Sequence, residues 1–181
     1  MAINILPPAE ELCNILDYDP ETGIFLWKVS RRGTSGVGSV AGRIDNSSYR
    51  RIKIGGNYYL AHRLAWKMSY GVDPTDEIDH KNGIRLDNRI CNLRKATRSE
   101  NQRNIAKYNN NKSGFKGVSW DKSRRKWIVA IKNNNKQKTL GRFTDINDAA
   151  AAYATAATAL HGEFLNLGTK ENNNDNDNQQ I

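Results

Sequence analysis

The chain has 181 residues, enough for one ordinary domain or two small ones, and it carries a formal net charge of +9. Residues 31–140 hold 25 Lys and Arg against 8 Asp and Glu, so the positive charge is concentrated where a polyanion could bind. The 2 cysteines form no CxxC pair and no apolar run is long enough to span a membrane, which argues against a disulfide framework, a cysteine-ligated zinc site and a membrane protein. Because the first residues do not resemble a secretory signal, we expect a cytoplasmic protein.

The first third of the chain predicts a helix, a strand and a loop in that order. Apolar side chains at residues 10–16 have helical spacing, and the Asp19-Pro20-Glu21-Thr22-Gly23 segment is typical of a turn. Residues 24–29 then predict a strand, and the Gly- and Ser-rich residues 31–38 predict a surface loop.

A basic hairpin and a second helix follow. Residues 49–54 alternate basic and apolar side chains, and Gly55-Gly56-Asn57 turns this strand back, so that the hairpin should have one basic face carrying Arg50 and Arg51. Residues 60–70 have helical spacing, with Gly71 as the residue that ends the helix.

Residues 76–107 predict two strands and a helix. A short strand should end at His80, and residues 92–96 can return as its antiparallel partner after the Asn82-Gly83 turn. The Thr97-Arg98-Ser99-Glu100 segment has the form of a capping box, so a helix should begin there and carry Asn101 in its first turn.

The last third predicts a small sheet and one long helix after a polar linker at residues 108–112. The expected strands are residues 115–120, 126–132 and 136–142. The Ala-rich residues 145–160 predict a helix that begins after Thr144 as N-cap and ends at Gly162. Residues 169–181 have almost no apolar side chains, so we expect them to be disordered.

The side chains around His80 suit phosphodiester hydrolysis, which needs an activated water and a positive charge near the phosphoryl oxygens. Asp79 offers a carboxylate oxygen and Asn101 a carboxamide oxygen, both hard ligands suited to Mg²⁺ or Mn²⁺. Because neighbouring residues of a strand point to opposite faces, His80 and Asp79 should project in opposite directions.

This segment resembles the HNH, or ββα-metal, nuclease family, and in particular phage-borne homing endonucleases. The matching segments are Ile78-Asp79-His80, Asp87-Asn88-Arg89, Asn92-Leu93-Arg94 and Ser99-Glu100-Asn101. The resemblance implies that His80 is the general base, that Asp79 and Asn101 hold one divalent ion, Mg²⁺ or Mn²⁺, and that Asn92 braces the loop and orients His80.

The resemblance extends upstream of the motif, to the segments Tyr18-Asp19-Pro20 and Ala61-His62-Arg63-Leu64-Ala65-Trp66. Arg63 is a candidate for a phosphate contact near the cut. His62 is either a supporting catalytic group or a structural residue of the helix, and the sequence leaves both interpretations open.

Residues 113–168 resemble the APETALA/ethylene-response-factor DNA-binding domain of plants. The residues that carry this resemblance are Gly117-Val118, Trp127, Leu140-Gly141-Arg142-Phe143, Ala149-Ala150, Tyr153 and His161-Gly162. The resemblance implies a three-stranded antiparallel sheet backed by one helix, with the exposed face of the sheet in the major groove. Trp127, Phe143 and Tyr153 are expected in the core between sheet and helix.

The expected DNA-binding residues come from both halves of the chain and are Arg50, Arg51, Arg63, Lys116, Arg124, Arg125, Lys132 and Lys138. The plant domains have arginines where this chain has Lys116, Ser119 and Lys132, and a tryptophan where it has Thr139. Lysine cannot read guanine through two parallel hydrogen bonds as arginine does, so this departure implies a different sequence preference.

Together these patterns predict an α+β protein: an HNH nuclease domain at residues 1–107, with its ββα-metal core at about residues 76–107, and a DNA-binding domain at residues 113–168. The predicted function is a metal-dependent endonuclease acting on double-stranded DNA as a monomer, without an obligate protein partner. A DNA-binding regulator that does not cut, and a protein that binds or cleaves RNA, stay open as alternatives.

Overall fold

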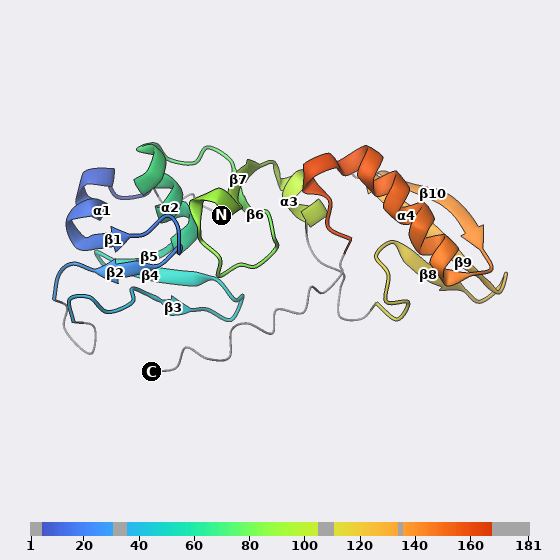
Figure 1. Ribbon diagram of the computed structural model, residues 1–181, viewed down its shortest axis with the longest axis horizontal. Coiled ribbons are helices and arrows are strands. Elements are labelled where there is room, and N and C mark those ends of the chain that lie inside the picture. Colours follow the sequence, from blue (N-terminus) through green and yellow to red (C-terminus); the bar gives the residue numbers. More distant parts are fainter. Residues whose placement is uncertain (1–4, 31–35, 105–110, 134–135, 168–181) are drawn as a thin grey trace. The chain divides into compact units, whose positions relative to one another are not determined.

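The computed structural model describes residues 5–30, 36–104, 111–133 and 136–167. The chain folds as two compact units, Met1–Asn101 and Gln102–Ile181. Each is built from small antiparallel sheets and helices (Figure 1), which confirms the predicted α+β class. Most of the predicted linker and the predicted disordered tail lie outside the described residues.

The described residues of the first unit contain three small sheets, two α-helices and one 3-10 helix, and the third α-helix begins at the end of the unit. In chain order the elements are α1 (Ala9–Ile15), β1 (Leu16–Tyr18), β2 (Phe25–Trp27), β3 (Arg43–Ile44), β4 (Arg50–Ile54), β5 (Asn57–Leu60), α2 (Ala61–Tyr70), β6 (Glu77–His80), the 3-10 helix η1 (Ile90–Asn92), β7 (Leu93–Ala96) and α3 (Arg98–Asn104). The sheets pair β1 with β2, β3 with β4 and β5, and β6 with β7.

The hairpin of β4 and β5 turns as the sequence predicts. Ile54 pairs with Asn57 across a two-residue loop in which Gly55 and Gly56 have φ values of 54° and 88°. Positive φ at both central residues is the requirement of the turn that matches strand twist. The strands β1 and β3 were not predicted, because each is too short to show an alternating pattern and forms only through pairing with a neighbour.

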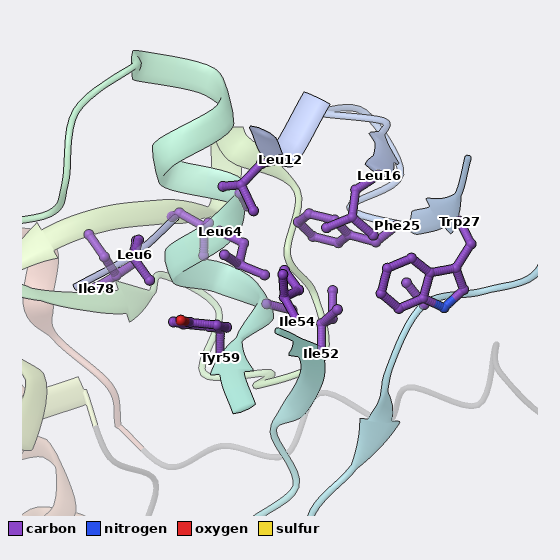
Figure 2. Close-up of a cluster of buried hydrophobic side chains, with 14 residues drawn as sticks. Leu6, Leu12, Leu16, Phe25, Trp27, Ile52, Ile54, Tyr59, Leu64 and Ile78 are labelled. Atoms are coloured by element: carbon purple, nitrogen blue, oxygen red, sulfur yellow. The ribbon is translucent and has the colours of Figure 1, made fainter. Parts of the chain in front are cut away.

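The core of the first unit gathers side chains from nearly every element. Figure 2 shows Leu12 of α1, Leu64 of α2 and Phe25 of β2 converging with Ile52 and other apolar side chains of the sheet around β4. Leu12, Leu64, Phe25 and Ile52 are all fully buried. Burial on this scale fixes α2 and the sheet as one rigid support for β6 and β7.

The second unit is the predicted three-stranded sheet backed by one helix. Its strands β8 (Val118–Asp121), β9 (Lys126–Asn133) and β10 (Lys136–Phe143) are antiparallel, with β9 in the middle. The helix α4 (Ile146–His161) is followed by the 3-10 helix η2 (Gly162–Phe164) and packs on one face of the sheet. Tyr153 is buried between helix and sheet, and Trp127 and Phe143 pack against the same core, as predicted.

Two details of the second unit differ from the sequence prediction. The N-cap of α4 is Asp145 rather than Thr144, because the Asp145 carboxylate accepts hydrogen bonds from the backbone N–H groups of Asn147 and Asp148. β8 begins at Val118 rather than at residue 115, because Gly117 has a φ of 73° and interrupts the extended backbone. Among the helices of the described residues, none is long and apolar enough to cross a membrane.

Candidate active site

The strands β6 and β7 place Asp79 and His80 on opposite faces of a two-stranded ribbon. Asp79 pairs with Arg94 and His80 pairs with Leu93, so that Asp79 and Arg94 share one face and His80 lies on the other. The exposed fractions of Asp79 and His80 are both 4%. Two adjacent polar side chains are therefore held in fixed and opposite directions.

Arg94 is the partner of Asp79 across the ribbon. Its Nε donates a hydrogen bond of 2.9 Å to Oδ2 of Asp79, and its Nη2 lies 2.8 Å from the same oxygen. Both side chains are buried, and a buried carboxylate requires such a partner because the loss of hydration is costly.

His80 lies in a polar and aromatic pocket formed by three other parts of the unit. Its Nε2 is 3.2 Å from Oδ1 of Asn88, and its ring packs edge-on against His62, with centroids 5.0 Å apart. The ring of Tyr49 lies 6.1 Å from that of His80. Burial lowers the pKa of His80, although Asn88 and nearby carboxylates oppose this shift, so the neutral imidazole is favoured.

His62 lies behind His80 and is also buried. The pKa of His62 is lowered to about 3, mainly by burial and also by the neighbouring His80 and Arg63. A neutral imidazole that packs between Tyr49 and His80 supports the position of the His80 ring. The structure thus brings His62 to the site, which the sequence left undecided.

Asn92 holds the loop between β6 and β7 through its side chain. Its Nδ2 donates to Oδ1 of Asn82 at 3.0 Å and to the backbone oxygen of Asp87 at 2.8 Å, while its Oδ1 accepts from the backbone N–H of Asn82 at 3.1 Å. These bonds fit the predicted bracing of the loop. The side chain that lies within hydrogen-bond distance of the His80 ring is Asn88, a residue that the sequence analysis gave no role.

Asn101 lies at the start of α3, next to the strand that carries Asp79. The predicted capping box is present, since Thr97 accepts from the N–H of Glu100 and the Glu100 carboxylate accepts from the N–H of Thr97. Nδ2 of Asn101 donates to Oε2 of Glu77 at 2.6 Å. Glu77 shares the Asp79 face of β6, so Asn101 is tied to the face that carries the carboxylate.

Five of the expected DNA-binding residues are engaged in contacts within the protein, and one of them is Arg124, whose Nη1 lies 3.5 Å from Oδ2 of Asp121. Arg50 donates to the backbone oxygen of Ala41, and Arg51 forms an ion pair of 2.6 Å with Asp45. Arg63 donates to the backbone oxygens of Pro74 and Asp76, which ties the segment before β6 to α2. Lys116 donates to the backbone oxygen of Asn166, and its burial lowers its pKa to about 8.

The register of β9 and β10 shows on which face of the sheet Lys132 and Lys138 lie. Lys132 pairs with Gln137 and projects from the face of the sheet opposite α4, whereas Lys138 pairs with the buried Ile131 and therefore projects on the α4 side. Lys132 and Lys138 were both expected to contact DNA through the exposed face of the sheet, and the register shows that they lie on opposite faces, so Lys138 does not belong to the face opposite α4. Arg142, which pairs with Ile128, lies on the Lys132 face instead, and Arg124 and Arg125 are exposed in the turn between β8 and β9.

The sequence motifs contained several site residues whose roles only the fold reveals. Asn88 and Arg94 lie within the quoted segments but were given no role. Arg85 was not considered, although its guanidinium stacks over Tyr49 at 4.9 Å and brings a cation close to the His80 pocket. The available signal was the position of Arg85 in the loop between the two predicted strands, which must lie near His80.

This chain is similar in sequence to a family model and to a phage protein. Residues 59–103 match the family model described as HNH endonuclease. The chain is 34% identical to Protein 3.8 of Escherichia phage T7 over 104 residues, which are 57% of this chain and 85% of that protein. A solved structure, titled DNA binding and cleavage by the HNH homing endonuclease I-HmuI, covers 81% of this chain and 85% of its own at 20% identity, with a TM-score of 0.39. That score is too low to support a shared fold.

The residues that the family model matches include the ribbon of β6 and β7, with the buried Asp79 and His80, and the first residues of α3. The chain belongs to the HNH endonuclease family, and it is an enzyme that cleaves DNA.

Proposed function

We propose that this chain hydrolyses phosphodiester bonds of double-stranded DNA with His80 as the general base and with one divalent cation, Mg²⁺ or Mn²⁺, held by Asp79 and Asn101. The observation that carries the proposal is the placement of Asp79 and His80 at adjacent, buried positions of β6 that face opposite ways. A metal ligand and a proton acceptor are then close together without competing for the same space.

The chemistry of the donors fits a hard divalent ion. Asp79 contributes carboxylate oxygens. Nδ2 of Asn101 donates to the Glu77 carboxylate, so Oδ1 of Asn101 points away from Glu77 and is the atom of this side chain that can bind a cation. Arg94 binds the same carboxylate, so its positive charge helps to keep Asp79 in place. When bound, the cation supplies positive charge to the phosphoryl oxygens and to the departing oxygen.

His80 suits the role of a base that accepts a proton from water. Burial favours its neutral form, which has one unprotonated ring nitrogen. The support from His62 and Tyr49 limits rotation of the ring, and Asn92 keeps the loop over β6 and β7 in one conformation. A base held in this way loses little entropy on the path to the transition state.

We propose that the second unit is a DNA-binding module of the APETALA/ethylene-response-factor type. Support comes from its sheet-and-helix architecture and from the face opposite α4, where Lys132 and Arg142 accompany Ser119 and Gln137. This face has a shallow hollow lined by Gly117, Val118, Ser119, Ala130, Ile131, Lys132 and Gln137. A face on which basic side chains lie beside polar ones suits the major groove.

The alternative is a DNA-binding protein that does not cut. This alternative predicts that removal of the His80 side chain affects only stability. The burial of the His80 ring and its packing against His62 favour the nuclease. We further propose that the enzyme acts as a monomer in the cytoplasm, where its DNA substrate is found.

The test is cleavage of genomic DNA from the organism that encodes the chain, in the presence of Mg²⁺ or Mn²⁺. EDTA should abolish cleavage, and His80→Ala should slow it by about 100- to 10,000-fold while DNA retention in a gel-shift assay is unchanged. Cleavage by His80→Ala at the wild-type rate would contradict the assignment of the base.

A further inference from the structure

Asn88, in the loop that precedes η1, is a buried polar residue with only 1% of its surface exposed. Its Nδ2 donates to the backbone oxygen of Leu86 at 3.2 Å, and its Oδ1 lies 3.2 Å from Nε2 of His80. A backbone oxygen can only accept, so the nitrogen end of the amide must face Leu86 and the oxygen end must face His80.

This orientation determines which nitrogen of the His80 ring carries the proton. Oδ1 of Asn88 has only lone pairs to offer, so Nε2 of His80 must be the donor. In a neutral imidazole the other nitrogen then has the lone pair. Asn88 therefore favours the tautomer of His80 in which Nδ1 is the proton acceptor.

The backbone of Asn88 is itself held by the hairpin of β1 and β2. Oη of Tyr18 donates to the backbone oxygen of Asn88 at 2.8 Å, across 70 residues of sequence. Pro20 accepts from the N–H of Ile90 at 3.1 Å. A Cβ added at Gly23 would lie 2.6 Å from the carbonyl carbon of Asn88, so the turn of the hairpin packs directly on this loop.

We propose that Asn88 is a positioning residue for the His80 base and that Tyr18 and the β1–β2 hairpin hold Asn88 in place for this purpose. The inference rests on the proposed role of His80. The inference gives the β1–β2 hairpin a part in catalysis, although this hairpin lies outside residues 59–103, the part of the chain that the family model matches. A packing role alone would require neither the amide oxygen at this point nor the donor at Tyr18.

The experiment compares single-turnover cleavage rates of the full chain on a duplex fragment that the wild type cuts, with Mg²⁺ or Mn²⁺ present. Asn88→Ala should lower the rate by about 10- to 100-fold without a change in DNA retention. Asn88→Asp keeps an acceptor at the same place and should recover most of the rate. Tyr18→Phe removes a single oxygen and should lower the rate by a few-fold.

A second measurement separates positioning from packing. In the wild type, the proton on Nε2 of His80 should exchange slowly in nitrogen-resolved NMR spectra, and in Asn88→Ala it should exchange quickly. In a His80→Ala background, Asn88→Ala should have no further effect on the residual rate, because the two residues act as a unit.

The outcomes distinguish the two claims. If Asn88→Ala cuts at the wild-type rate while His80→Ala does not, the role of Asn88 is overturned and the proposed function stands. If Asn88→Ala and Asn88→Asp are equally slow and also melt earlier, Asn88 is a packing residue only. If His80→Ala itself cuts at the wild-type rate, the proposed function fails and the inference fails with it.

Discussion

Arg94 binds Asp79 across the β6–β7 ribbon, with Nε 2.9 Å and Nη2 2.8 Å from a single carboxylate oxygen. Exposed fractions of 9% and 5% for the two side chains mean that water screens this ion pair little. The pair joins the strand that carries the proposed base to the strand that leads into α3.

Arg94→Ala should therefore lower the free energy of unfolding by about 3 to 5 kcal/mol, because it leaves a buried carboxylate without its cation. Urea unfolding followed by tryptophan fluorescence measures this loss. Arg98→Ala is the matched control, since Arg98 is exposed on the next element. Equal stability of the two variants would show that the pair contributes nothing.

The lysines of the second unit provide a test of the proposed DNA face. Lys132→Ala and Arg142→Ala should each weaken DNA retention and reduce the slope of log affinity against log salt by about 1, because each removes a phosphate contact. Lys138→Ala, which removes the same type of charge from the α4 side of the sheet, should leave the slope unchanged. A larger effect at Lys138 than at Lys132 would place the DNA on the other face.

The cap of α4 gives a prediction that separates two neighbouring residues. Asp145→Ala should lower the free energy of unfolding of the second unit by about 1 kcal/mol, because the N–H groups of Asn147 and Asp148 lose their acceptor. Thr144→Ala should have almost no effect. Thermal melting monitored by circular dichroism compares the two variants. A greater loss of stability in Thr144→Ala than in Asp145→Ala would show that Thr144 is the N-cap, as the sequence predicted.

Acid should destabilise the protein through three carboxylates that accept hydrogen bonds. The pKa of Asp121 is held well below its usual range, mainly by the Ser123 hydroxyl, and the pKa values of Asp45 and Asp87 are lowered mainly by the backbone of Tyr49 and the side chain of Arg89. A carboxyl group whose pKa is lowered on folding stabilises the folded state above its unfolded pKa of about 3.9 and loses that contribution as the pH falls further.

The melting temperature should accordingly begin to fall as the pH drops below about 6.5, because His62 and His80 are buried in their neutral forms, and it should fall further below about pH 4, where these carboxylates become protonated. Asp121→Asn cannot be protonated in this range, so its melting temperature should fall less steeply below pH 4 than that of the wild type. A parallel decline of the two proteins would show that Asp121 does not contribute.

Local patterns determined much of the fold. The capping box at Thr97 and Glu100, the Gly55-Gly56 turn and the end of α2 at Gly71 were predicted because each depends on residues close in sequence and on backbone conformations that only a few residue types adopt. The opposite directions of Asp79 and His80 were predicted for the same reason, since they follow from the period of a strand.

The sequence by itself determined the family motif and the class of fold, and it predicted the residues that we propose to carry the chemistry. Only the tertiary structure decided what each of them contacts. The pairing of Asp79 with Arg94 depends on strand register, and the bond from Nε2 of His80 to Asn88 depends on the path of a loop. The bond from the Tyr18 hydroxyl to the backbone oxygen of Asn88 joins two segments that lie 70 residues apart in the sequence. The sequence does not show such contacts, because the spacing of residues along the chain does not encode the distances between them after folding.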